Sequence, residues 1–117
     1  MVCAVPVDNK MAIIKKVGVE TVPLWQLLDR YVPANTKIDL LTVDVEGLDY
    51  DVLKSNDWSR YSPEFILVEC LEFQAMGQLK SDPIVEFLSD LHYSMVAKTM
   101  LTVLFRLIMP DDCESAN

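Results

Sequence analysis

Three carboxylates stand where two apolar runs of the chain end. Asp44 and Glu46 close the run Ile38–Gly47, which reads Ile-Asp-Leu-Leu-Thr-Val-Asp-Val-Glu-Gly, and Glu69 lies near the end of the run Phe65–Leu71. Grouped carboxylates can take a proton from a hydroxyl group, bind a divalent cation or accept hydrogen bonds from the start of a helix. The spacing alone does not discriminate among these uses. The helices and strands that carry the acids have to be considered next.

Both apolar runs are expected to be buried β-strands. Ile, Leu or Val fill half of the run Ile38–Gly47, and turn-like sequence precedes it, which favours a strand over a helix. Because a strand has a period of two residues, Asp44 and Glu46 should point to the same side. Ligands of open α/β sheets bind just outside the carboxyl ends of the strands, so the acids predict a binding crevice there.

Helical and β-rich segments alternate with these two strands. The further expected elements are β segments at Val2–Val7 and Ala12–Thr21, helices at 22–31, 48–55 and 82–91, and final strands at Met95–Met100 and Thr102–Ile108. Such alternation predicts an α/β fold with a parallel sheet covered by helices, to which the last adjacent pair adds one antiparallel strand.

Size and charge limit the class of protein. The chain of 117 residues is expected to form one α/β domain over residues 1–109, followed by a disordered acidic tail from Pro110. Its net charge of -8 argues against binding to nucleic acid or to an anionic membrane, because both need a positive surface. A small-molecule or protein partner is therefore expected.

The cysteines and the apolar segments indicate a cytoplasmic protein. Cys3, Cys70 and Cys113 are odd in number and lack Cys-x-x-Cys spacing, so we expect reduced thiols and no metal site. No secretory signal is recognisable at the start. The most apolar stretch, Tyr93–Met109, contains two basic residues and is shorter than the ~20 residues that span a bilayer.

The chain resembles the C-terminal half of the FkbM-type S-adenosylmethionine-dependent methyltransferases. The resemblance extends from about Val19 to about Ile108 and rests on the segments 22–28, 38–47 with its Asp-Val-Glu-Gly core, 48–54 and 63–69. Glycine occurs only at positions 18, 47 and 77, so the chain contains no Gly-x-Gly turn. The glycine-rich cofactor loop of the family is thus absent. We expect the N-terminal cofactor half of the domain to lie outside this chain, so that the chain is a fragment inactive alone and becomes a methyltransferase when a missing N-terminal segment or a partner completes it.

The resemblance implies a partial Rossmann-like class I methyltransferase sheet, mostly parallel with one antiparallel strand near the C-terminus and helices on its faces. It also implies S-adenosylmethionine as cofactor and O-methylation of a small-molecule or sugar hydroxyl. Asp44 would orient or deprotonate that hydroxyl, Glu46 would position the acceptor or brace the turn, and Glu69 would line the same crevice. Asp44, Val45 and Gly47 are the candidates for contact with the cofactor.

Three other hypotheses fit the same residues. Asp44 or Glu46 could cap the helix that begins at Leu48. A strand that ends in Asp-x-Glu also opens metal-dependent 3′–5′ exonucleases, which need further aspartates on later helices with a nearby His or Tyr. A non-enzymatic half-domain could instead form homo-oligomers, or bind a partner, through the open apolar edge at Leu40–Val45.

Overall fold

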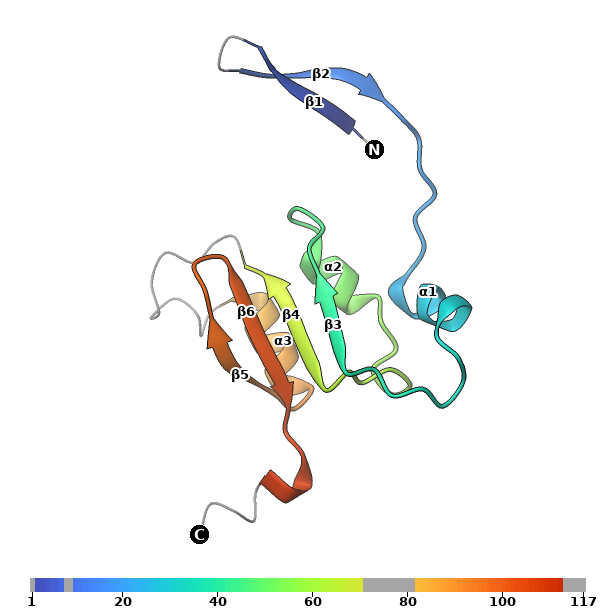
Figure 1. The fold of residues 1–117 in the computed structure, drawn as a ribbon, viewed down its shortest axis with the longest axis vertical. Coiled ribbons are helices and arrows are strands. Elements are labelled where there is room, and N and C mark those ends of the chain that lie inside the picture. Colours follow the sequence, from blue (N-terminus) through green and yellow to red (C-terminus); the bar gives the residue numbers. More distant parts are fainter. Residues whose placement is uncertain (1, 8–9, 71–81, 113–117) are drawn as a thin grey trace.

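The computed structural model describes residues 2–7, 10–70 and 82–112 of the chain (Figure 1). In chain order the helices and strands of these ranges are β1 (Val2–Val7), β2 (Lys10–Lys16), α1 (Leu24–Tyr31), β3 (Leu40–Val43), α2 (Asp49–Lys54), β4 (Phe65–Glu69), α3 (Pro83–Asp90), β5 (Tyr93–Lys98) and β6 (Thr102–Leu107). The expected α/β class is thereby confirmed. The two N-terminal β segments pair with each other as an antiparallel hairpin.

The main sheet has the strand order β3-β4-β6-β5. β3 pairs in parallel with β4, whereas β6 runs antiparallel to both of its neighbours. The expected single antiparallel strand near the C-terminus is found as β6. Because β6 lies between β4 and β5, however, two of the three strand pairs are antiparallel, so the mostly parallel pairing that was expected is not found. The short connection at residues 99–101 joins β5 and β6 as antiparallel neighbours, and the pairing of β6 with β4 places this reversed strand inside the sheet.

The hydrophobic core lies between the sheet and the two helices α2 and α3, which cover the same face (Figure 1). Leu53 of α2 and Leu88 of α3 are fully buried there. Along β4, Ile66 and Val68 face this core, because alternate side chains of a strand share a face. Phe105 of β6 packs in the same cluster. One face of the sheet is thus closed by helices.

The opposite face is not covered by a helix in the described part of the chain (Figure 1). Thr42, Leu67 and Leu104 follow one another across β3, β4 and β6 on this face, and the side chain of Leu40 is 52 % exposed. Helix α1 lies beside α2 instead, where its first backbone N–H donates a hydrogen bond to the side-chain oxygen of Ser55 at 2.9 Å. Helices on both faces were expected, and the described residues provide them on one.

Several element ends differ from the expected ones. The sequence pattern predicts a strand that continues to Val45, but β3 ends at Val43 because the backbone N–H of Val45 is donated to the side chain of Asp49. His92 has a φ of 67° and follows α3, as expected of a helix break, but Tyr93 already begins β5.

The chain after β6 continues into a short turn. Residues 110–112 form one 3₁₀ turn, and the remainder of the predicted acidic tail lies outside the described residues. Within the described ranges, no helix has the length and apolar character needed to cross a membrane.

Removing side-chain volume from the helix-covered core should destabilise the protein. We expect Leu53→Ala to lower the free energy of unfolding by about 2–5 kcal/mol, because a fully buried leucine leaves a cavity. The matched substitution Met100→Ala, at a side chain that is 82 % exposed, should change it by less than about 0.5 kcal/mol. Urea denaturation measures both. Equal losses would contradict the assigned core.

The free edge of β3 should cause self-association at raised concentration. β3 is the last strand on its side of the described sheet, and unpaired strand edges pair readily with other chains. We expect Leu40→Lys to reduce association in sedimentation velocity, since a charged residue on an edge strand disfavours pairing with another chain. Met100→Lys introduces the same charge at another exposed position and should leave association unchanged. A wild-type chain that stays monomeric at every concentration would contradict this prediction.

Candidate active site

The parallel pairing of β3 with β4 brings the predicted acids together. Val43 lies opposite Val68, so the carboxyl ends of both strands meet at one edge of the sheet. Asp44 follows β3 directly and Glu69 is the last residue of β4. Carboxylate oxygens of Asp44, Glu46 and Glu69 all lie within 4.8 Å of one another. The three acids therefore form one cluster, in which Asp44 and Glu46 are exposed and Glu69 is half-buried.

Glu46 reaches the cluster through a turn, not through the alternation of a strand. Beyond β3, Glu46 has a φ of 52° and Gly47 a φ of 97°, both in the left-handed region. A Cβ atom on Gly47 would meet no atom within 4 Å, so the glycine is required by the backbone conformation and not by lack of space. The expected strand geometry of Asp44 and Glu46 is thus wrong, although their carboxylates do converge.

Asp49 holds this turn. Its Oδ1 accepts a hydrogen bond from the backbone N–H of Val45 at 3.4 Å, and its Oδ2 accepts one from the N–H of Gly47 at 3.2 Å. The residue is 3 % exposed. Helix α2 begins after Leu48 without a side-chain cap. The hypothesis that Asp44 or Glu46 caps this helix is therefore wrong, and sequence reasoning missed the role of Asp49, whose only signal is an acid two positions after the glycine.

Glu69 and Asp44 interact directly. A hydrogen bond with Asp44 is the main cause that raises the pKa of Glu69 above its ordinary value. Burial and the negative charges of Asp44, Glu46 and Asp49 act in the same direction. Since two adjacent carboxylates resist simultaneous ionisation, Glu69 holds its proton to a higher pH than an isolated glutamate would. A carboxyl group whose pKa is shifted toward neutrality suits proton transfer to or from a hydroxyl.

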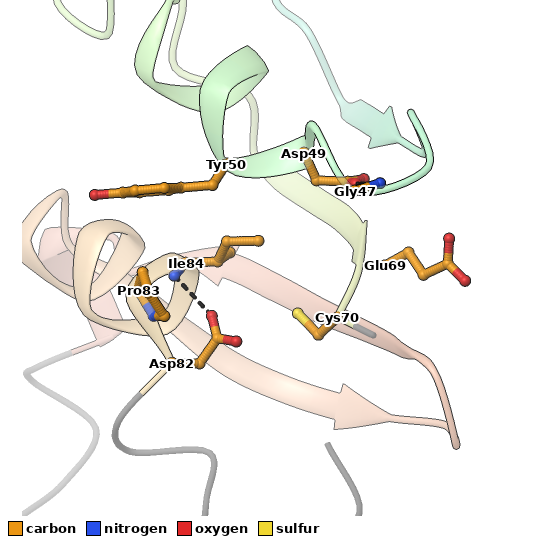
Figure 2. A pocket seen from close by; sticks show the side chains of 8 residues that line it. All are labelled: Gly47, Asp49, Tyr50, Glu69, Cys70, Asp82, Pro83 and Ile84. Atoms are coloured by element: carbon orange, nitrogen blue, oxygen red, sulfur yellow. Dashed lines mark hydrogen bonds between the residues drawn. The ribbon is translucent and has the colours of Figure 1, made fainter. Parts of the chain in front are cut away.

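A hollow of about 210 Å³ opens between α2 and α3 at the end of β4 (Figure 2). Its described lining consists of Gly47, Asp49, Tyr50, Glu69, Cys70, Asp82, Pro83 and Ile84. Glu69 also lines a second hollow of about 200 Å³ together with Asp44 and residues of β3, β4 and the start of β6. Sequence reasoning missed Tyr50, Cys70 and Asp82 as lining residues, and only the helix start at Asp82 was apparent.

The three clustered carboxylates have the composition of a divalent-cation site. An exonuclease-type site needs additional aspartates, and the nearest candidates already accept backbone hydrogen bonds. Asp49 binds the turn, and Oδ1 of Asp82 accepts from the N–H of Ile84 at 2.7 Å. The hydroxyl of Tyr93 donates to the backbone oxygen of Pro63 inside the core. These contacts do not assemble the further ligands that the nuclease hypothesis requires.

The comparison with protein families assigns the chain to one family. A family model described as the methyltransferase FkbM domain matches residues 8–95, a span that contains Asp44, Glu46 and Glu69. The chain belongs to this methyltransferase family. The match is to a partial domain, which agrees with the resemblance to one half of an FkbM-type enzyme. Searches of curated proteins and of solved structures return no significant match.

Loss of the Asp49 side chain should destabilise the FkbM-type turn. We expect Asp49→Ala to lower the free energy of unfolding by about 1–3 kcal/mol, because two backbone N–H groups lose their acceptor. Asp51→Ala is the matched control in the same helix turn. Its exposed ion pair with Lys54 at 3.0 Å should contribute less than about 1 kcal/mol. Equal losses in chemical denaturation would show that Asp49 does not hold the turn.

The Asp44–Glu69 interaction should be visible in a titration. We expect the carboxyl carbon of Glu69 to titrate above 4.5 in NMR spectra, and Asp44→Asn to lower that pKa. Because the pKa is raised by folding, the protonated pair stabilises the fold below the unfolded pKa, and this contribution is lost as pH rises through the folded one.

A control removes an exposed acid that lies at the opposite end of β3. Asp39→Asn should leave the pKa of Glu69 unchanged, because Asp39 lies near Lys37 and not in the cluster. An Asp44→Asn variant with an unaltered Glu69 titration would refute the interaction.

Proposed function

We propose that this chain takes part in S-adenosylmethionine-dependent O-methylation of a small-molecule or sugar hydroxyl. The observation that carries the proposal is the convergence of Asp44 and Glu69 at the ends of two parallel strands in a chain of the FkbM family. When bound, the cofactor supplies an electrophilic methyl group on sulfur. The protein then has to align the acceptor oxygen and remove its proton.

The acids divide this work. Asp44, exposed at the end of β3, accepts a hydrogen bond from the acceptor hydroxyl. Glu69 exchanges a proton with Asp44, so the hydroxyl proton has a place to go. Glu46 lies within the same cluster and positions the acceptor from the turn.

The clustered carboxylates also suit the cofactor. S-adenosylmethionine carries a positive sulfonium and a positive ammonium group, and exposed carboxylates attract both. Asp44 and the exposed side chain of Val45 are the groups of the turn that remain for contact with it. The N–H groups of Val45 and Gly47 are already donated to Asp49.

The sheet supports placing the chain in the carboxyl half of a Rossmann-like domain. From their pairing, β3, β4 and β5 run in one direction and β6 runs in the other. Since the sequence contains no Gly-x-Gly turn, we propose that a further polypeptide segment beside the free edge of β3 completes the cofactor site. The odd number of cysteines favours a cytoplasmic location.

A second function is favoured by the same free edge. An unpaired β3 with an exposed Leu40 is suited to oligomerisation or to binding a partner without catalysis. In that case the three carboxylates need only stay hydrated at the surface, and their protonation has no chemical role.

Transfer of a radiolabelled methyl group to a panel of hydroxyl compounds tests the enzymatic proposal. We expect Asp44→Asn to reduce the rate by about 10²–10⁴-fold, the range typical for loss of general base catalysis. Asp39→Asn, which removes an equal charge outside the cluster, should keep the wild-type rate.

Two results would contradict the proposal. Equal rates for Asp44→Asn and the wild type would remove Asp44 from the reaction. Absence of both methyl transfer and heat of S-adenosylmethionine binding in calorimetry, measured with the completing segment present, would favour the partner-binding function instead.

A further inference from the structure

The hollow between α2 and α3 has a charge distribution that the methyl-transfer chemistry does not require. Its described lining contains three carboxylates, those of Asp49, Glu69 and Asp82, and no lysine or arginine. A ligand of this hollow therefore meets negative charge on several sides.

The rest of the lining is uncharged. Figure 2 shows Tyr50 from α2 extending alongside Pro83 and Ile84 at the start of α3. The Tyr50 ring packs edge-on against Phe87, with 5.8 Å between ring centroids, so this wall is fixed in place. Lys54 Nζ lies 4.3 Å from the centroid of the Tyr50 ring, so this ring already makes a cation–π contact within the protein.

The floor of the hollow is neutral as well. Cys70 is buried, and burial raises the pKa of its thiol to about 12. The charges of Asp82 and Asp49 act in the same direction, and the charge of Lys98 acts against them. The thiol consequently stays protonated at neutral pH and offers no anionic nucleophile. A neutral floor, an apolar wall and acidic residues suit a small molecule with an apolar body and a positive group.

We propose that this hollow holds the non-reacting part of the methyl acceptor and selects cationic or neutral acceptors over carboxylated or phosphorylated ones. The term acceptor rests on the proposed function. Glu69 connects the hollow with the proposed reaction site, because it lines the hollow and also hydrogen bonds with Asp44. A molecule in the hollow thus presents a hydroxyl toward the pair, and an anionic substituent would be repelled by the same acids.

Three phenols with the same ring and hydroxyl group test the charge preference. Tyramine carries an ammonium group, tyrosol is neutral and 4-hydroxyphenylacetate carries a carboxylate. We would titrate each into the isotope-labelled full chain without cofactor and follow the amide signals of Tyr50, Cys70 and Ile84. We expect tyramine to bind about tenfold more tightly than 4-hydroxyphenylacetate, with tyrosol between them. Equal affinities, a preference for the anion, or no binding by any probe would overturn the inference.

A substitution that removes charge but keeps the helix start sharpens the test. Asp82→Asn retains an N-cap side chain for α3, because asparagine caps about as well as aspartate. We expect it to reduce the tyramine preference by about threefold. Asp90→Asn makes the same change at the exposed opposite end of α3 and should leave the preference unchanged. The same preference in both variants would overturn the role of Asp82.

The outcomes separate this inference from the proposed function. Binding of the probes is measured without methyl transfer. Charge-selective binding in a chain that transfers no methyl group would leave the hollow as a binding site and contradict only the enzymatic proposal. Methyl transfer without a charge preference would contradict only the selectivity of the hollow.

Discussion

The site depends on two hydrogen bonds. The buried carboxylate of Asp49 accepts both of them from the backbone that precedes it. They fix the backbone N–H groups of Val45 and Gly47 in a turn with left-handed residues. A buried carboxylate is tolerable only with such partners, so the turn and the acid stabilise each other. The turn ends β3, starts α2 and places Asp44 and Glu46 beside the end of β4.

Three carboxylates lie within 4.8 Å of one another, and the stability of the fold does not by itself explain this grouping. The hydrogen bond to Asp44 raises the pKa of Glu69, and burial and the repulsion between like charges at this distance act in the same direction. Local rules of this kind are typically broken at functional sites. In an FkbM-family chain, the same arrangement provides a carboxyl pair that can exchange a proton with a bound hydroxyl.

Much of the fold follows from the sequence because its signals are local. The apolar runs gave the strands β3 and β4, and Asp82 with Pro83 marked the start of α3. The Asp-Val-Glu-Gly motif indicated the family, and the family model confirmed it. The acids of two separate strands could be assigned to one crevice because parallel strands end at the same edge.

The remaining features depend on contacts that no local pattern encodes. The position of β6 between β4 and β5 is set by sheet pairing over long sequence separation, so the count of antiparallel pairs could not be read from the strands themselves. The bond from Asp49 back to Val45 ends β3 early, against the strand preference of Val45. The hollow beside Cys70 needs α2 and α3 in place before it exists.

The pH dependence of the methyl-transfer rate tests the central claim, that Asp44 and Glu69 share the proton of the acceptor. The wild-type rate should rise with pH through an acid limb whose midpoint lies above 4.5, following the raised pKa of Glu69. In Glu69→Gln this limb should move to lower pH, because the partner that holds the extra proton is gone. Identical profiles for the two proteins would contradict the account.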